Sequence, residues 1–210
     1  MGTEADVSAL MNVVNVSRET IDKLQSYERL LKHWTQAINL ISKSTETEIW
    51  PRHFLDSAQF WNLRPENCEY WLDLGTGGGF PGLVVAVIAS ELDPEMRFGF
   101  VESDARKASF LLKAGHELGI KPKIHIARAE SLEPQSASVV SVRAMAPVQK
   151  LLGYARRHMA EGGLSLFAKG ENHETELTEA QKYWKFDVQK VPSITDASGT
   201  ILKIKGITRV

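Results

Sequence analysis

Apolar residues in the first third of the chain recur at helical spacing. They stand three or four positions apart within residues 7–14 and again within residues 24–41, which indicates two amphipathic helices. Ser17 precedes the second stripe and suits a helix cap. A coiled coil also explains that stripe, but the stripe spans too few heptads to favour it. With a third helix predicted from Glu46 to Trp61, we expect residues 1–65 to form a helical extension packed on the core.

From residue 66 onward short apolar strands alternate with helical segments, and we expect residues 66–210 to form one domain. The predicted strands cover 70–74, 97–101, 123–127, 138–142 and 164–168, and the predicted helices cover 80–90, 105–118, 148–159 and 175–184. Segments 186–191 and 201–207 are expected to close the chain as an antiparallel pair. This alternation predicts an α/β fold with a mostly parallel, doubly wound sheet, whose ligand binds at the carboxyl ends of the strands near the switch in strand order.

The segment between Trp71 and Gly82 reads as a buried strand that ends in an acid, then a glycine turn, then the start of a helix. Glycines let the backbone turn sharply and approach a ligand closely, and a helix start offers unpaired NH groups. The spacing of Gly77, Gly79 and Gly82 also matches the dinucleotide pattern, so NAD or FAD remains an alternative. Asp73, directly before the glycines, suits a ligand with an amino acid group and a sulfonium cation better than a pyrophosphate.

Two further strand ends carry candidate binding residues. Glu102 lies twenty positions after Gly82, where an acid accepts hydrogen bonds from ribose hydroxyls, although an exposed strand-end acid is the simpler interpretation. Ala129 and Glu130 follow the third predicted strand, where a backbone NH and a carboxylate are placed to meet an adenine edge. All three predicted strand ends converge on one crevice.

Composition limits the choice of class. The chain has 210 residues, 43% of them hydrophobic, and a single cysteine, Cys68, which together indicate one substantial core in a reducing, cytoplasmic compartment. Neither a metal site nor a membrane span is expected from the spacing of the residues. The net charge of −1 argues against bulk electrostatic binding of nucleic acid, yet residues 103–157 carry ten Lys or Arg against four Asp or Glu, which permits a local basic face.

The glycine segment resembles the first motif of S-adenosylmethionine-dependent methyltransferases of the Rossmann-like class. Four further motifs follow the same family pattern in order over residues 20–207: Asn39-Leu40, Arg52-His53-Phe54-Leu55-Asp56-Ser57, Ser141-Val142-Arg143-Ala144 and Lys169-Gly170. The whole set is similar to the bacterial 16S ribosomal RNA guanine-N7 methyltransferases, the glucose-inhibited division protein B family. The resemblance implies a class I methyltransferase fold in the cytoplasm, with S-adenosylmethionine as donor and S-adenosylhomocysteine as product.

The resemblance also implies roles for single residues. Gly75 and Phe80 are expected to contact the donor through the first loop, where Gly77 is a further candidate. Ala129 and Glu130 are expected to contact the adenine side of the donor, and Arg143 to lie at the end of the fourth strand near donor and substrate. Two departures stand out. Family members often have Asp where this chain has Glu102, and the stretch 131–135 has fewer acids than in many members.

Guanine N7 carries a lone pair and no proton, so methylation at this atom requires alignment and no general base. Arg143 is the candidate catalytic residue, because a guanidinium stacks on a base or holds phosphate; the alternative is a structural ion pair with Glu102 or Glu130. The candidates for binding RNA, with the simpler interpretation of each, are Arg52, His53 (a packing histidine), Arg106 and Lys107 (a solvated helix face) and Lys169 (a solvated lysine).

The expected partner is 16S ribosomal RNA or the small ribosomal subunit, bound by a monomer at a single-stranded loop base that is splayed into a pocket. Two alternatives remain open at this point. One is an NAD- or FAD-dependent oxidoreductase, which the glycine spacing permits. The other is a non-catalytic RNA-binding factor for ribosome assembly on the same fold.

Overall fold

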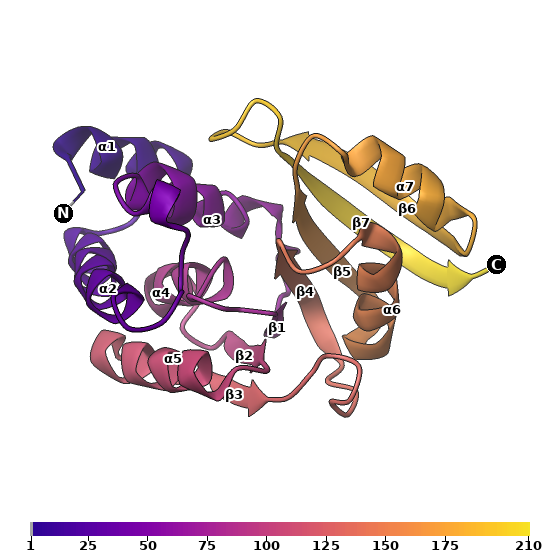
Figure 1. Cartoon of the computed structure of the whole chain (residues 1–210), viewed down its shortest axis with the longest axis horizontal. Helices are drawn as coiled ribbons and strands as arrows, with labels where there is room; N and C mark the ends of the chain where they lie inside the picture. The colour runs from indigo at the N-terminus through magenta and orange to yellow at the C-terminus, as the bar shows by residue number, and fades with distance from the viewer. Residues whose placement is uncertain (1) are drawn as a thin grey trace.

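The computed structural model describes residues 2–210 and contains a single seven-stranded sheet (Figure 1). The strand order is β3-β2-β1-β4-β5-β7-β6. The strands are β1 Tyr70–Leu74, β2 Arg97–Glu102, β3 Lys123–Ile126, β4 Ala137–Arg143, β5 Met159–Lys169, β6 Trp184–Pro192 and β7 Thr200–Arg209.

The first five strands are parallel, and β7 is the strand that runs in the opposite direction. β1 pairs in parallel with β2 on one side and with β4 on the other, whereas β7 runs antiparallel to both of its neighbours, β5 and β6. This arrangement confirms the predicted mostly parallel, doubly wound sheet with an antiparallel pair at its end. The strand order changes direction between β1 and β4, so the crevice expected at the switch point lies over these two strands.

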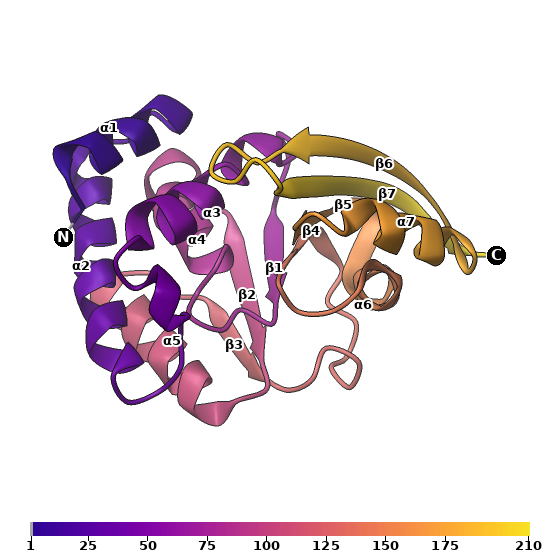
Figure 2. The same cartoon turned by 45° about the horizontal axis from the view of Figure 1, so that its top comes forward.

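Alternate residues of each strand face opposite layers of helices. Trp71 packs with α2 (Arg18–Thr35), α4 (Gly82–Leu92) and α5 (Ala105–Leu118), whereas Leu72 packs with α6 (Val148–His158) and α7 (His173–Gln181). Figure 2 shows the α2–α5 helices on one side of β1 and the α6–α7 pair on the other. The helices α4 to α7 match the segments predicted for them, although α7 begins and ends earlier than predicted and β5 begins directly after α6.

The N-terminal helices share a core with the first half of the sheet. α1 (Glu4–Val13) starts with a capping box at Thr3, and the Ser17 side chain caps α2 as predicted. Buried side chains of these helices pack in one cluster with those of α4 and α5. The helix predicted through residue 41 ends at Thr35, so Ile41 is buried from a loop instead.

The single helix predicted from Glu46 to Trp61 is wrong. The structure has four short elements in this region: a 3₁₀ turn η1 (Lys43–Thr45), a π-helical segment η2 (Trp50–Leu55), one α-turn α3 (Asp56–Ala58) and a 3₁₀ turn η3 (Trp61–Leu63). Pro51 lacks a backbone NH and stands at the start of η2, so a regular helix cannot run through it from Glu46. The apolar spacing used for the prediction is real, because Ile49, Phe54 and Trp61 are all buried.

Candidate active site

The glycine loop after β1 is fixed by backbone hydrogen bonds to the end of β2. The NH groups of Gly75 and Thr76 both donate to the Val101 carbonyl, at 2.8 and 3.2 Å. Gly75 and Gly77 have φ angles of +67° and +56°, a region that favours glycine. A Cβ atom on Gly75 would lie 3.1 Å from Met145 Sδ, so a side chain at this position would press against Met145.

Asp73 lies beneath this loop, not at its surface. Its fully buried carboxylate accepts hydrogen bonds from the Ser141 hydroxyl and, at 3.3 Å, from the Gly82 backbone NH at the start of α4. Burial raises the pKa of Asp73 to about 7, against the opposing effect of these hydrogen bonds. The Asp73 carboxylate thus contacts Ser141 and the start of α4, and it does not line the cleft described next.

The ends of β1, β2 and β3 form a cleft of about 350 Å³, which we term the donor cleft. It is lined by Gly75, Val101, Glu102, Ser103, Ala127, Arg128, Ala129, Glu130, Met145, Ala146, Lys150 and Tyr154. Glu102, 7% exposed, accepts hydrogen bonds from the NH groups of Gly77 at 2.9 Å and Asp104 at 2.8 Å. The structure thus brings together Gly75, Glu102, Ala129 and Glu130 as predicted from the sequence.

The loop after β3 is held in place from α6. His158 donates through Nε2 to the carbonyl of buried Ala129 at 2.7 Å, and the Tyr154 hydroxyl contacts the exposed Glu130 carboxylate. Burial and the neighbouring Glu130 raise the pKa of Tyr154. Glu130 therefore stands at the mouth of the donor cleft with its position restricted by a tyrosine.

A second cleft of about 360 Å³, which we term the target cleft, lies beyond the tip of β4. It is lined by Thr45, Arg52, His53, Asp56, Arg143, Ala144, Ala168, Lys169, Gly170, Ser193, Thr195, Asp196, Gly199, Thr200 and Ile201. Residues 144–146 separate it from the donor cleft, with Ala144 on one side and Met145 on the other. Ala144 has a φ of +51°, a left-handed conformation that costs an alanine about 1 kcal/mol or more.

Arg143 ends β4 and points its guanidinium into a polar cluster. The group lies 3.3 Å from Asp56 Oδ2, donates to His53 Nδ1 at 2.9 Å and stands over the Phe80 ring at 4.8 Å from the ring centroid. The alternative ion pairs with Glu102 or Glu130 are wrong, because the carboxylate that pairs with Arg143 comes from the N-terminal third of the chain.

His53 is buried at the floor of the target cleft. Its ring stacks on Phe80 with centroids 4.8 Å apart, and its Nε2 meets Thr45 Oγ1 at 2.9 Å. Burial, together with the charges of Arg143 and Arg52, lowers the pKa of His53 to about 3. Since Arg143 donates to Nδ1, the proton of the neutral ring resides on Nε2. His53 is thus a satisfied histidine that still lines a cleft.

The remaining predicted site residues do not lie together in one cleft. Phe80 is buried below Arg143 and does not line the donor cleft, so its predicted donor contact finds no support. Lys169 pairs with Glu176 at 2.7 Å and donates to the Ala146 carbonyl, so its interpretation as a solvated lysine is wrong. Arg106 pairs with Asp104 at the start of α5 and, like Lys107, lines neither cleft.

Arg52, the other predicted RNA contact at the target cleft, forms an exposed ion pair with Asp196 at 3.2 Å. Asp196 belongs to the turn between β6 and β7. Sequence reasoning missed this turn, and it gave no role to Asp56 although Asp56 lies inside a motif that the family resemblance used. The helical pattern around Asp56 signalled packing alone, so no sequence signal pointed to its carboxylate.

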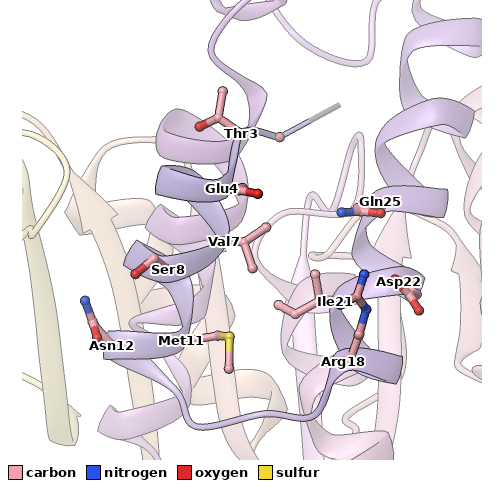
Figure 3. A pocket seen from close by; sticks show the side chains of 11 residues that line it. Thr3, Glu4, Val7, Ser8, Met11, Asn12, Arg18, Ile21, Asp22 and Gln25 are labelled. Atoms are coloured by element: carbon pink, nitrogen blue, oxygen red, sulfur yellow. The ribbon is translucent and has the colours of Figure 1, made fainter.

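A third groove, of about 630 Å³, lies between α1 and α2 and is unrelated to the strand ends. Figure 3 shows Val7, Met11 and Ile21 directed into it. No predicted site residue lines it. Within residues 2–210, no group of three or more His, Cys, Asp or Glu side chains is arranged to hold a metal ion, and no helix is long and apolar enough to cross a membrane.

The donor cleft fits S-adenosylmethionine by its own chemistry. The Glu102 and Glu130 carboxylates and Ala129 line one cleft at the carboxyl ends of neighbouring parallel strands, which is where folds of this kind bind their ligands. Gly75 and Met145, whose side chain lies against the glycine, line the same cleft. These features define an S-adenosylmethionine-dependent methyltransferase of the Rossmann-like class.

Comparisons with known proteins agree. The family model described as rRNA small subunit methyltransferase G matches residues 20–204. A protein of Cereibacter sphaeroides named ribosomal RNA small subunit methyltransferase G is 48% identical over 99% of this chain and 100% of its own length. A protein of the same name from Ruegeria is 42% identical, over 94% of this chain and 96% of its own length.

Solved structures share the fold at low identity. The ribosomal protein L11 methylase of Lactobacillus delbrueckii has a TM-score of 0.59 at 11% identity, covering 73% of this chain and 78% of its own. The tRNA (m1A58) methyltransferase of Aquifex aeolicus has a TM-score of 0.53 at 15% identity, covering 88% of this chain and 76% of its own.

The chain belongs to the rRNA small subunit methyltransferase G family. This membership confirms the predicted family, fold, donor and activity: an S-adenosylmethionine-dependent guanine-N7 methyltransferase of 16S ribosomal RNA. It also decides against the oxidoreductase that the glycine spacing permitted.

Proposed function

We propose that the donor cleft holds S-adenosylmethionine and that the target cleft receives the guanine base of the RNA, so that the methyl group passes across residues 144–146. The observation that carries this assignment is the adjacency of the two clefts on either side of that segment. Glu102 and Glu130 are the proposed acceptors for ribose and adenine, and Gly75 and Gly77 provide the close backbone approach.

When bound, S-adenosylmethionine supplies a sulfonium methyl group that guanine N7 attacks with its lone pair. The chain has only to align the base and to exclude water, because no proton leaves N7. The state of His53 agrees with this, since the neutral ring uses both nitrogens for hydrogen bonds and none is left for proton transfer. Asp56, which pairs with Arg143 and lines the target cleft, places negative charge on the side where the methylated purine becomes positive.

Arg143 is the proposed catalytic residue, oriented to stack on the guanine or to hydrogen-bond its carbonyl oxygen. The cations that line the target cleft are each paired within the described chain: Arg143 with Asp56, Arg52 with Asp196 and Lys169 with Glu176. Such a cleft favours a polar base over a run of phosphates. A single-stranded base splayed from a loop fits it, because N7 within an A-form helix lies in a groove that side chains cannot enter.

Arg52, His53 and Lys169 are the proposed substrate contacts at this cleft, while Arg106 and Lys107 are proposed to meet RNA beside the donor cleft. We further propose that the protein acts as a cytoplasmic monomer on 16S RNA or on the small subunit. Residues 1–65 then form a helical extension and residues 66–210 the methyltransferase domain.

The test uses purified protein, S-adenosylmethionine labelled in its methyl group, and either naked 16S RNA or small subunits. We expect label in 7-methylguanosine at one position, with whichever RNA form presents the loop correctly. Label in protein or in small molecules would refute the substrate assignment. Calorimetry with S-adenosylhomocysteine tests the donor cleft separately: donor binding without transfer of label to RNA would contradict the assignment of the target cleft and leave that of the donor cleft standing.

A further inference from the structure

Asp56 lies where three distant parts of the chain meet. It follows η2 and begins α3, it is half-buried, and its carboxylate lines the target cleft. One of its oxygens faces the tip of β4 and the other faces the turn between β6 and β7. A side chain that served packing alone would not need two charged or polar partners from two separate elements.

The Oδ1 atom holds the β6–β7 turn. It accepts hydrogen bonds from Thr195 Oγ1 at 2.9 Å and from Ser193 Oγ at 3.4 Å. Gln59, one turn later, donates to the same oxygen and accepts from the Ile194 backbone NH at 3.2 Å. The turn, which forms one wall of the target cleft, is therefore attached to the N-terminal third of the chain through Asp56 and Gln59.

The Oδ2 atom holds Arg143 at 3.3 Å. The other groups on the guanidinium are the Arg52 carbonyl at 3.2 Å and the neutral ring of His53 at 2.9 Å. Among residues 2–210, Asp56 is the carboxylate within ion-pair distance of Arg143. The Arg143 side chain is 19% exposed, so an unpaired charge at this position carries a real desolvation cost.

We propose that Asp56 is a positioning residue for methyl transfer: it fixes the direction of the Arg143 guanidinium and links that direction to the β6–β7 turn that closes the target cleft. RNA that contacts the turn thereby acts on Arg143 through one carboxylate. The proposal rests on the proposed function of the target cleft. It adds that contact of the RNA with the β6–β7 turn is coupled to the orientation of Arg143 for methyl transfer.

The first test measures single-turnover methylation of the RNA with Asp56→Asn. The amide keeps the size and an acceptor for Thr195, but it loses the charge that faces Arg143. We expect the rate at saturating RNA to fall at least tenfold, while the affinity for S-adenosylhomocysteine, measured by calorimetry, stays within twofold of wild type. Asp56→Glu restores the charge and is expected to recover part of the rate. Glu174→Gln, which removes an exposed ion pair to Lys190 on β6, is the matched control and is expected to stay within twofold.

The second test distinguishes the contact of Asp56 with the β6–β7 turn from its ion pair with Arg143. Thr195→Val removes one hydrogen bond to Oδ1 and leaves the ion pair to Arg143, so we expect the KM for RNA to rise severalfold with kcat within twofold. In an Arg143→Lys background, Asp56→Asn is expected to add less than a threefold loss, because both changes interrupt the same contact.

Each remaining outcome overturns the proposal. A wild-type rate for Asp56→Asn removes the residue from the reaction. Asp56 has only a general structural role if Asp56→Asn lowers the donor affinity by the same factor as the methylation rate. The same conclusion follows if the double variant loses the full product of the rate factors of Asp56→Asn and Arg143→Lys. If Asp56→Asn does not fold, Thr195→Val and Asp56→Glu decide the question. Failure of the proposed function is a different result, since wild-type protein would then form no 7-methylguanosine.

Discussion

The two clefts are built in opposite ways. The donor cleft is made by three neighbouring strands and the loops that directly follow them, and its key contacts use the backbone: Gly77 NH to Glu102, and Gly75 NH to Val101. The target cleft is made by side chains from the segment around residues 45–56, the tip of β4, the end of β5 and the β6–β7 turn.

This difference shows what holds each site in shape. Register within a parallel sheet fixes the donor cleft, because the pairing of Leu74 with Val101 places both strand ends at one edge. In the target cleft no shared sheet connects η2 to the β6–β7 turn, and the pairs Asp56–Arg143 and Arg52–Asp196 bridge them instead. We therefore expect charge substitutions in the target cleft to lower the methylation rate, and charge substitutions in the donor cleft to weaken the binding of the donor.

The largest expected effect tests the target side. Arg143→Ala removes the guanidinium proposed to orient the base, and we expect methylation to fall about a thousandfold, or about 4 kcal/mol in activation free energy. Donor affinity should stay within threefold, because Arg143 does not line the donor cleft. Single-turnover formation of 7-methylguanosine checks this, with calorimetry on S-adenosylhomocysteine as control. Near-normal turnover would remove Arg143 from the mechanism.

The next prediction contrasts the pH dependence of stability on the two sides. Asp73 has a pKa of about 7, above its ordinary 3.8, so the folded state binds the extra proton and the free energy of unfolding falls as pH rises from 4 to 7. His53 has a pKa of about 3, below its ordinary 6.5, so the unfolded state binds the extra proton and stability is lost as pH falls below 6.5.

Urea unfolding at pH 5 and pH 8 separates these opposing contributions. We compare the change in the free energy of unfolding from pH 5 to pH 8 in each variant with the same change in wild type. For Asp73→Asn this change should be more positive by about 2 kcal/mol, and for His53→Gln it should be more negative by a similar amount. Parallel curves for either variant and wild type would mean that the group has no shifted pKa in the folded protein.

The donor side gives a smaller change. Glu102→Gln replaces one acceptor of the Gly77 and Asp104 NH groups by an amide NH₂ and removes the charge proposed for the ribose hydroxyls. We expect the donor Kd to rise about tenfold, or about 1.4 kcal/mol, with little change in the single-turnover rate at saturating donor. Glu133→Gln, exposed and outside the cleft, is the control in the same calorimetric titration. Equal affinities for the two variants would contradict the role of Glu102.

The smallest effect tests whether the donor side depends on the N-terminal helices. The buried Tyr27 hydroxyl of α2 donates to the Gly78 carbonyl in the glycine loop. Tyr27→Phe leaves that carbonyl without its partner, so we expect the free energy of unfolding to fall by about 1 kcal/mol. Urea unfolding measures the change, with Tyr183→Phe, whose residue is 43% exposed, as the control. An unchanged midpoint of urea unfolding would show that the hydrogen bond from Tyr27 does not stabilise the glycine loop.

Local sequence patterns were enough to predict the sheet, its direction and most of the donor cleft. Strand and helix periods are local properties of the chain, and the acids that follow neighbouring strands of a parallel sheet must meet at one edge. Glu102 and Glu130 could therefore be assigned to that edge from their positions along the chain. The family resemblance rested on the same kind of local information, because its motifs are short runs of neighbouring residues.

The target cleft, by contrast, depends on how distant segments pack together. Asp56 and Arg143 are far apart in the sequence, and their pairing depends on how the π-helical segment after Pro51 turns toward β4. The burial of Asp73, whose carboxylate does not line the donor cleft, depends in the same way on where α4 packs. Hydrophobic periodicity reports which face of a segment is buried, but it carries no information about which distant charge that face meets. Sequence reasoning therefore selected Arg143 as a candidate, but the ion pairs that it weighed as the alternative, with Glu102 or Glu130, are not the pair that the structure forms.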